Sequence, residues 1–292
     1  MISRFILLLK SIYNISKGGI SLSVALTTAT GYFLATRQID LSVVFPFTGV
    51  LLLAQAASII NQIKERHTDK LMPRTQNRPL ISNELSIRTS FLFSIFLTIS
   101  GLFILGYFNG VVCALLGLFN LLWYDYVYTP LKYKTAFASI PGGIVGAVPP
   151  IIGWIAGGGN ILHPTSIALA VFFFIGQIPH FWLIVIKYSN EYELAGIKSI
   201  TERFSLPQIK RLVFTWILAT SLCGSIFSLF IIINNNFTFW LLQSYSLALV
   251  VFFLFWFTKE LNYKSTRAFI SINIYYLIVM ITIIADIAIG RS

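Results

Sequence analysis

The chain has 292 residues, of which 57% are hydrophobic, 15% aromatic and only 11% charged, and its formal net charge is +11. Soluble domains normally carry about 25% charged residues, so this composition excludes an ordinary soluble globule and indicates that most of the surface faces lipid. Both cysteines lie inside apolar runs, where a thiol behaves as a small hydrophobe, so neither a disulfide framework nor a cysteine metal site is expected.

The first 17 residues form a basic and partly apolar segment that contains no acidic residue. Lys10 interrupts the apolar stretch, and no small-residue cleavage site follows it. We therefore expect residues 1–17 to be a retained N-terminal segment that lies as a helix at the membrane interface. A short organelle presequence has the same composition and is the alternative.

Nine apolar runs follow, each near the roughly 20 residues that a helix needs to cross a bilayer. They predict an all-α fold, a polytopic membrane bundle of about nine transmembrane helices around a central cavity, built as a single domain over residues 18–292. The expected spans are residues 18–36, 41–61, 89–108, 110–129, 139–157, 165–186, 211–233, 239–258 and 268–289.

Basic residues orient this bundle, because Lys and Arg collect on the cytoplasmic side of a membrane. With the N-terminus inside, all but two of the 21 basic residues fall on the inner side, and the exceptions are Arg37 and Arg291. The sequence therefore predicts a cavity that opens at the cytoplasmic side, an outer C-terminus, and a location in the bacterial cytoplasmic (inner) membrane. The positive charge then reflects orientation and attraction to anionic lipid, and no nucleic-acid partner is expected.

The most polar stretch, residues 61–80, follows the second span on the inner side. Asn61, Glu65 and Asp69 are four residues apart, so they share one face if the helix continues to about Leu71. Two carboxylates and an amide oxygen form a hard-oxygen cluster, which suits Mg²⁺ because this ion binds through a few carboxylates and substrate phosphates. The cluster predicts a site that holds a diphosphate through Mg²⁺ at the membrane surface.

Two arginines follow this cluster. Pro73 is expected to end the helix, and the guanidinium groups of Arg74 and Arg78 suit diphosphate oxygens. The alternative is a solvated loop, in which Lys and Arg enforce orientation and the acidic residues pair with them at helical spacing. The amide at the membrane edge, the regularly spaced carboxylates and the arginines after a proline together favour the functional interpretation.

The fourth span ends in a stripe of polar and aromatic residues, Asn120, Tyr124, Tyr128 and Lys132, that share one helical face. Aromatic faces beside a phosphate site suit a developing carbocation, and Lys132 or Lys134 would help to neutralise a leaving diphosphate. An interfacial tyrosine belt with orienting lysines explains the tyrosines equally well.

Residues 139–154 combine small side chains with Pro149 and Pro150, which predicts close helix packing followed by a break. Asp125 and Asp286 lie near or inside apolar spans, and the sequence assigns neither of them a role.

The sixth span places His180, Lys187 and Glu191 on one stripe, so Glu191 can face the same mouth as a further metal-binding carboxylate. A surface pair with Lys187 explains Glu191 equally well. Pro179 is expected to kink this helix where it lines a cavity. His180 would then contact a substrate, although a single histidine inside a membrane is more often a packed, hydrogen-bonding residue.

These motifs make the chain resemble the intramembrane aromatic prenyltransferase superfamily over roughly residues 15–290, and within it the branch that modifies haem. Three segments depart from the family pattern: Tyr133 replaces a common second basic residue, Glu191 replaces an Asp, and residues 196–201 replace Gly-Ile-Pro-Met-Leu-Pro. The resemblance is carried by Asn61, Glu65, Asp69, Met72, Arg74, Thr75, Arg78, Pro79 and Leu80, by YTPLK at 128–132, by GGIVGAVPPIIGW at 142–154 and by PHFW at 179–182.

The resemblance implies transfer of a farnesyl group from farnesyl diphosphate to the vinyl group of haem b (protohaem IX), with Mg²⁺ as the cofactor. The lipid bilayer would deliver both hydrophobic substrates, and association with haem A synthase or with terminal oxidase assembly is a further expectation. The implied roles are metal binding by Asn61, Glu65, Asp69 and Glu191, diphosphate departure assisted by Arg74, Arg78, Lys132 and Lys134, cation stabilisation near Tyr124 or Tyr128, and acceptor contact by His180.

Three alternatives remain open. A prenyltransferase that acts on a quinone-precursor aromatic acid or a naphthoate would share every metal-site residue and differ only in its acceptor. A transporter or channel would place ionisable residues at mid-membrane, whereas here they crowd one end of the spans. A haem-binding assembly factor would keep the pocket but would not need the diphosphate cluster.

Overall fold

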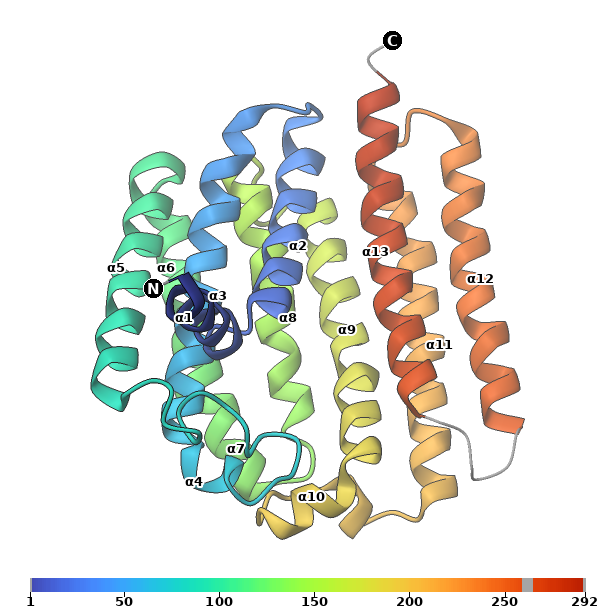
Figure 1. Ribbon diagram of the computed structural model, residues 1–292. Coiled ribbons are helices and arrows are strands. Elements are labelled where there is room, and N and C mark those ends of the chain that lie inside the picture. Colours follow the sequence, from blue (N-terminus) through green and yellow to red (C-terminus); the bar gives the residue numbers. More distant parts are fainter. Residues whose placement is uncertain (1, 259–264, 291–292) are drawn as a thin grey trace.

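A computed structural model describes residues 2–258 and 265–290, and every regular element in these ranges is a helix (Figure 1). Nine segments of the described ranges are long and apolar enough to cross a membrane, which confirms the predicted all-α bundle and its spans. The bundle consists of α2 (Gly18–Thr36), α3 (Val44–Lys64, preceded by the 3-10 turn η1, Leu41–Val43), α5 (Ile87–Asn109), α6 (Val111–Leu122), α8 (Ser139–Ala156), α9 (Pro164–Lys187), α11 (Leu206–Phe230), α12 (Asn236–Thr258) and α13 (Ser265–Ile289).

The third and fourth spans are separate helices, as predicted, although a single residue joins them. Gly110 lies between α5 and α6 with a φ of 92°, a conformation that residues with side chains rarely adopt. Beyond its last residue, α6 continues through the π-helical η2 (Trp123–Tyr128) into α7 (Thr129–Lys134).

The predicted break at Pro149 and Pro150 is wrong, because α8 continues through both prolines to its end. Pro149 has no N–H for the carbonyl of Val145, which lies one turn earlier. Asn120 Nδ2 on α6 donates to that carbonyl instead, at 3.2 Å. A side chain of the neighbouring helix thus satisfies the backbone group that the proline frees.

Helices α2 and α8 approach each other closely through two glycines. A Cβ added to Gly153 would overlap the carbonyl oxygen of Thr28, and one added to Gly31 would overlap the carbonyl oxygen of Pro150. The backbones therefore pack directly against each other, as small residues permit between membrane helices. This part of the packing prediction for residues 139–154 is confirmed.

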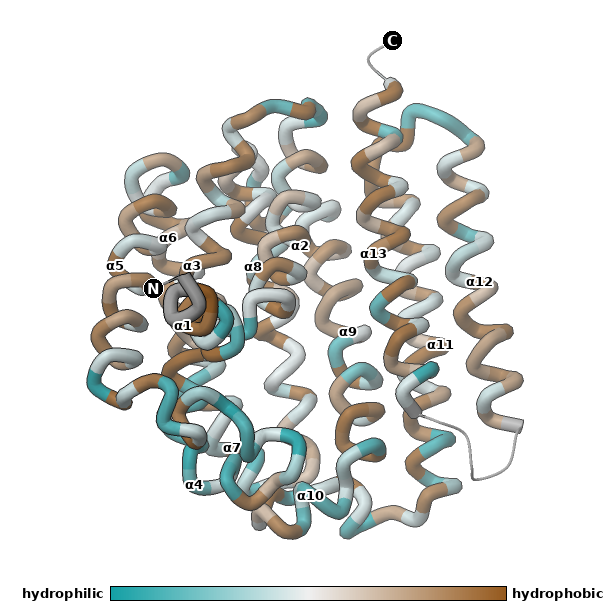
Figure 2. Tube along the Cα trace, viewed as in Figure 1, coloured by the Kyte–Doolittle hydropathy of each residue, from teal (hydrophilic) through white to brown (hydrophobic). Residues whose placement is uncertain are grey.

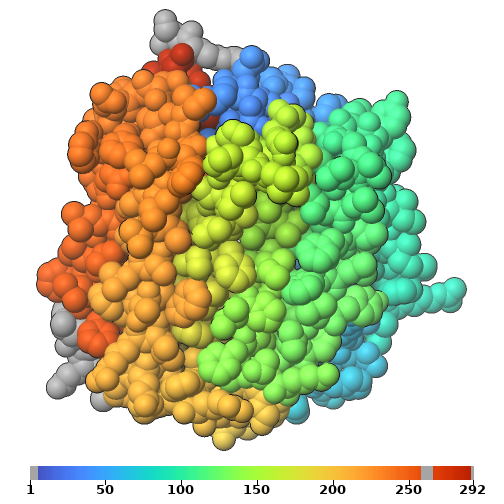
Figure 3. Space-filling model, turned by 180° about the vertical axis from the view of Figure 1, so that it is seen from behind, coloured from blue at the N-terminus to red at the C-terminus, as the bar shows by residue number. Residues whose placement is uncertain are grey.

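Two clusters of buried apolar side chains flank this contact. One joins α3, α5 and α6, the other joins α2, α9, α11, α12 and α13, and α8 contributes to both. On the face opposite to that of Figure 1, α6, α8, α9 and α11 follow one another across the surface (Figure 3).

The long polar connections lie at one end of the bundle, together with α4 (Arg66–Asp69), α7 and α10 (Ser189–Leu194) (Figures 1 and 2). The connection of α11 to α12 lies at the opposite end. Lys259, Lys264 and Arg291, three basic residues used to predict orientation, lie outside the described residues. The direction of the bundle across a membrane stays a prediction.

Helix α1 (Ile2–Ile15) runs across the bundle, since Figure 1 shows it nearly end-on while the long helices stand upright. Gln62 Nε2 of α3 donates to the carbonyl oxygen of Ile15 at 2.7 Å and fixes the end of α1. Leu7, Leu9 and Tyr13 are exposed, as expected for a helix that lies in a lipid interface.

The two ends of the bundle provide a test of topology. Reporter proteins fused at Ser82, in the loop before α5, and at Asn235, between α11 and α12, should report opposite sides of the membrane. Activity of a cytoplasmic reporter at Ser82 and of an exported reporter at Asn235 would support the predicted orientation. The same side for both fusions would contradict the nine-span topology.

Candidate functional site

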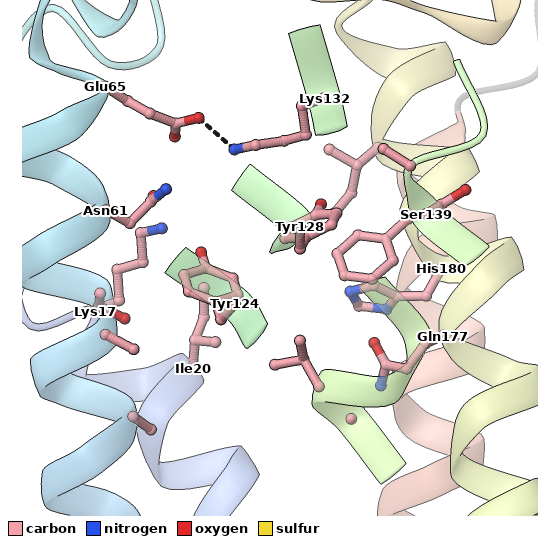
Figure 4. A pocket seen from close by; sticks show the side chains of 18 of the residues that line it. Lys17, Ile20, Asn61, Glu65, Tyr124, Tyr128, Lys132, Ser139, Gln177 and His180 are labelled. Atoms are coloured by element: carbon pink, nitrogen blue, oxygen red, sulfur yellow. Dashed lines mark hydrogen bonds and ion pairs between the residues drawn. The ribbon is translucent and has the colours of Figure 1, made fainter. Parts of the chain in front are cut away.

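A cavity of ≈ 400 Å³ opens between α2, α3, α6, α8 and α9 and reaches the polar end of the bundle. Its mouth is charged and its deeper part is apolar. Figure 4 shows residues of the two walls facing each other, with Lys17, Asn61 and Tyr124 on one side and Gln177 and His180 on the other. The structure gathers here most of the residues that the sequence singled out: Asn61, Glu65, Asp69, Arg74, Arg78, Tyr124, Tyr128, Lys132 and His180.

Two predicted site residues do not line this cavity. Glu191 lies at its edge, where the carboxylate accepts a hydrogen bond from the backbone N–H of Arg74 at 3.2 Å. Lys134 lies at the end of α7, away from the lining. The roles assigned to both residues stay predictions.

Asn61, Glu65 and Asp69 share one face although the helix that carries them is interrupted. Helix α3 ends at Lys64, yet the backbone N–H of Glu65 donates to the Asn61 carbonyl at 2.8 Å, and that of Asp69 donates to the Glu65 carbonyl at 2.7 Å. Helical spacing therefore persists across the interruption. Three side chains of one face consequently reach the same cavity.

The expected continuation to Leu71 and the stop at Pro73 are wrong in detail, because α4 already ends at Asp69. The hydroxyl of Thr75 donates to the carbonyl oxygen of Asp69 at 2.7 Å and so caps the helix end. The chain then folds back, which brings Arg78 beside Asp69.

Each of the three carboxylates pairs with a cation from another part of the mouth. Glu65 accepts a hydrogen bond from Lys132, and Asp69 accepts one from Arg78. Glu191 pairs with Arg74, whose guanidinium also lies 4.7 Å from the ring centre of Tyr188. These three ion pairs bring acidic and basic groups of residues 65–78, α7 and α10 together at the mouth of the cavity.

Burial and neighbouring charge act differently on the two carboxylates of the α3–α4 face. Burial opposes the charged form of Glu65, but Lys132, together with Lys17 and Arg78, holds the pKa of its carboxyl below the ordinary value. For Asp69, burial outweighs Arg78, and the pKa of its carboxyl is raised. Glu65 is therefore the more firmly ionised of the two.

The amide of Asn61 is oriented by a short chain of hydrogen bonds. Thr129 donates its hydroxyl hydrogen to the carbonyl of Tyr124 at 2.9 Å, so its oxygen is left to accept from Asn61 Nδ2 at 3.1 Å. The Nδ2 of Asn61 thus faces Thr129, and Oδ1 is left for another partner. Partners of this kind hold a metal ligand in position.

The aromatic wall comes from the π-helical turn η2. Tyr124 and Tyr128 have ring centres 5.6 Å apart, and Tyr128 lies 5.5 Å from Phe181 of α9. Lys132 Nζ lies 5.4 Å from the ring centre of Tyr128. Single π-helical turns are often found at functional sites, and here one precedes the lysine that binds Glu65.

Lys17 lines the cavity, although no sequence pattern indicated it as a site residue. It caps the start of α2 with a φ of 47°, and Figure 4 shows its amine pointing toward Asn61. Of the five basic side chains that line the cavity, four pair with a carboxylate, whereas Lys17 has no such partner among the described residues. Burial, followed by the charges of Arg78 and Lys132, lowers the pKa of Lys17 to about 8.

His180 lies on the opposite wall, with its ring centre 4.5 Å from that of Phe269. Gln177, one turn earlier on α9, faces the cavity beside it (Figure 4). This wall offers two polar groups in an otherwise apolar and aromatic setting.

The two acidic residues without a predicted role lie outside the cavity. Asp125 is fully buried on the far side of η2, where Lys64 Nζ donates to its backbone carbonyl at 2.9 Å. Asp286 accepts a hydrogen bond from the backbone N–H of Asn234 at 2.8 Å and fixes the α11–α12 connection at the other end of the bundle. Asp286 is therefore structural.

The donor set at the mouth suits a divalent cation. Within residues 2–258 and 265–290, no three His, Cys, Asp or Glu side chains converge as a complete metal cage. Glu65 and Asp69 nevertheless line the cavity together with the amide of Asn61. A few oxygen ligands, completed by water and substrate phosphate, are the usual protein environment of Mg²⁺.

Comparison with known proteins places this cavity in a family context. The sequence pattern of the UbiA prenyltransferase family matches residues 24–277. Proteins named protoheme IX farnesyltransferase are similar: that of Oleidesulfovibrio alaskensis is 37% identical over 60% of this chain and 62% of its own, and that of Aquifex aeolicus is 34% identical over 71% and 72%. The chain thus spans less than two thirds of the former relative's length.

Solved structures share the fold at low sequence identity. A UbiA homologue from Archaeoglobus fulgidus, bound to DMAPP and Mg²⁺, superposes with a TM-score of 0.69 over 95% of this chain and 99% of its own, at 17% identity. A UbiA homologue from Aeropyrum pernix K1 gives a TM-score of 0.74 over 94% and 99%, at 16% identity.

Proposed function

The chain belongs to the UbiA prenyltransferase family, and from this premise we propose that it transfers a farnesyl group from farnesyl diphosphate to a vinyl group of haem b, giving haem O. The observation that carries the proposal is one apolar cavity with carboxylates, an amide and paired cations at its mouth and tyrosines just inside. The similar proteins named protoheme IX farnesyltransferase support the choice of donor and acceptor.

The cations of the mouth bind the diphosphate. Arg78 and Lys132 exchange their carboxylate partners for phosphate oxygens, and Lys17 contributes a charge that has no ion-pair partner among the described residues. Asn61, Glu65, Asp69 and Glu191 would hold Mg²⁺, which would offset the negative charge of the bound diphosphate. Arg and Lys side chains thereby stabilise the leaving group where charge develops.

Bond cleavage takes place where the charged mouth meets the apolar part of the cavity. The bond between farnesyl C1 and the diphosphate oxygen breaks, and its electron pair leaves with the diphosphate. The rings of Tyr124 and Tyr128 present their electron-rich faces to the allylic cation. Apolar walls keep water away until the new carbon–carbon bond has formed.

The vinyl group of the acceptor supplies the electron pair for that bond. The cation left on the former vinyl group takes up a water molecule and releases a proton, which yields the hydroxyethylfarnesyl side chain of haem O. His180 and Gln177 contact the tetrapyrrole from the α9 wall. The reaction proceeds in the bacterial cytoplasmic (inner) membrane with the mouth on the cytoplasmic side, and association with haem A synthase or terminal oxidase assembly would remove the product.

An assay with defined substrates tests this function. Purified protein incubated with Mg²⁺, farnesyl diphosphate and haem b should yield haem O, detected by chromatography of the extracted haems. If an aromatic acid or naphthoate is prenylated and haem b is not, the acceptor is wrong. Asp69→Ala should lower the rate by about 10²–10³-fold, because the substitution removes both a metal-binding carboxylate and the ion-pair partner of Arg78.

The control is Lys70→Ala, which changes an exposed residue of the same loop that does not line the cavity. It should retain the original rate. Size-exclusion chromatography in detergent reports the membrane insertion and yield of both variants. These measurements distinguish a loss of catalytic activity from a loss of folding. An unchanged rate in Asp69→Ala would contradict the metal-site assignment.

The lowered pKa of Lys17 leads us to expect that binding of farnesyl diphosphate depends on pH. Because its pKa is lowered to about 8, the amine is charged below that pH and becomes neutral above it. The KM for farnesyl diphosphate should therefore rise as pH increases through about 8. Lys17→Met should have a high KM at all pH values, without this rise.

The measurement is the KM for farnesyl diphosphate between about pH 6.5 and 9.5. Lys10→Met, which removes an exposed lysine from α1, serves as the control and should keep the pH dependence of the original protein. A rise of KM that persists in Lys17→Met would assign the titration to another group.

A further inference from the structure

Gln62 is a buried amide beside the cavity that the proposed reaction does not use. It follows Asn61 on α3 and is 2% exposed. Successive residues of a helix point about 100° apart, so Gln62 faces another side of α3 than Asn61, which lines the cavity. A polar side chain buried in an apolar bundle costs free energy unless hydrogen bonds compensate it. The partners of Gln62 therefore indicate what its amide does.

These partners lie at the end of α1. Gln62 Nε2 donates to the carbonyl oxygen of Ile15 at 2.7 Å and to that of Asn14 at 3.4 Å. The last carbonyls of a helix have no partner within the helix, so the amide of Gln62 caps α1 from the neighbouring helix. Gln62 Oε1 has no hydrogen-bond partner among the described residues. The donor half of the amide is thus the half that the structure uses.

Only Ser16 and Lys17 separate this capped end from α2. Ser21 Oγ of α2 donates to the carbonyl oxygen of Ser16 at 2.9 Å, and the backbone N–H of Lys17 donates to that of Asn14 at 3.2 Å. Lys17 has a φ of 47°, a left-handed conformation that costs free energy unless the surrounding structure holds it. The turn is therefore held from α3 through the end of α1 and from the first turn of α2.

The conformation of this turn decides where the amine of Lys17 lies. Lys17 lines the cavity, and its amine points toward Asn61 (Figure 4). Gln62 is the next residue of α3, so adjacent residues carry the amide that faces the cavity and the amide that fixes the chain two residues before Lys17. Movement of the end of α1 away from α3 would displace the amine from Asn61.

A second contact holds α1 at a point farther from Lys17. Ser11 Oγ donates to the carboxylate of Glu84, in the loop before α5. Ser11 lies in the middle of α1, six residues before Lys17, and it does not line the cavity. Attachment of α1 to the bundle can therefore be changed there without touching the turn at Lys17.

On the basis of the proposed diphosphate site, we infer that Gln62 is a positioning residue for the prenyl diphosphate. It holds the end of α1 against α3, so that Lys17 presents its amine to the diphosphate beside Asn61. The effect of Gln62 on the diphosphate is exerted through Lys17 and through no contact of its own.

A double-mutant cycle tests this inference. Dissociation constants for farnesyl thiodiphosphate, a non-hydrolysable donor analogue, are measured with Mg²⁺ for the original protein, Lys17→Met, Gln62→Met and the double variant. Gln62→Met keeps an unbranched side chain of similar size but removes the donor, and it should weaken binding by about fivefold, as expected for one neutral hydrogen bond. The double variant should bind no more weakly than Lys17→Met, because the two residues act as one unit.

Additive losses in the double variant would show that Gln62 acts independently of Lys17 and would overturn the inference. An unchanged dissociation constant in folded Gln62→Met would also overturn it. Gln62→Asn, which keeps the amide but shortens the side chain, replaces Gln62→Met if that variant does not fold. It should weaken binding only where Lys17 is present.

Ser11→Ala is the matched control, because it removes the other contact of α1 and leaves the turn at Lys17 intact. It should bind the analogue as the original protein does. In the assay of haem O formation, Gln62→Met should raise the KM for farnesyl diphosphate and retain kcat, whereas general loosening of the bundle would lower kcat as well.

The binding measurement does not depend on the acceptor, so it separates this inference from the proposed function. If the original protein does not bind the thiodiphosphate, the proposed diphosphate site is wrong. If the original protein and Gln62→Met bind it equally well, only the role of Gln62 is wrong. If the cycle gives the expected result but haem b is not prenylated, the inference stands and the acceptor is wrong.

Discussion

Charges at the end of an apolar bundle must be paired, and this requirement governs the mouth of the cavity. A carboxylate that is partly removed from water costs several kcal/mol unless a cation and hydrogen bonds compensate it. Glu65 meets this requirement through Lys132 and Asp69 through Arg78, so α3 is tied to α7 and α4 to the following loop. The same ion pairs that hold these segments together bring the oxygen donors and the cations of the site to one place.

Below the mouth, the structure depends on close approach of helices. Glycines bring α2 to α8 and α6 to α3, and an amide of α6 satisfies the carbonyl that Pro149 leaves free on α8. The cavity lies between helices whose backbones cannot separate or slide without breaking these contacts. The walls of the cavity are thus held by direct contacts between helices, whereas the charged mouth is made of loops and short helices.

Much of the fold and part of the site follow from the sequence, for physical reasons that differ from residue to residue. The spans are predicted well because lipid requires about 20 apolar residues in each of them. The common face of Asn61, Glu65 and Asp69 is predicted because helical hydrogen bonds persist from Asn61 to Asp69 across the interruption at Glu65. Lys17 could not be predicted as a site residue, because its position depends on its own left-handed backbone conformation between α1 and α2. This conformation creates no spacing pattern with residues 61–80. The continuity of α8 was missed because it depends on Asn120, a side chain of another helix.

Under the proposed function, the ammonium group of Lys17, which has no ion-pair partner among the described residues, favours an anionic ligand. Arg74, Arg78, Lys132 and Lys198 each have a carboxylate partner, so these pairs contribute little net charge. Lys17 adds a positive charge inside the cavity, and burial, followed by the charges of Arg78 and Lys132, lowers its pKa because these surroundings disfavour that charge. A bound diphosphate would offset this cost and would offer oxygens to Arg78 and Lys132. Under the proposed function, Glu65 and Asp69 would then be free to bind a divalent cation, so the binding of diphosphate and the binding of metal would favour each other.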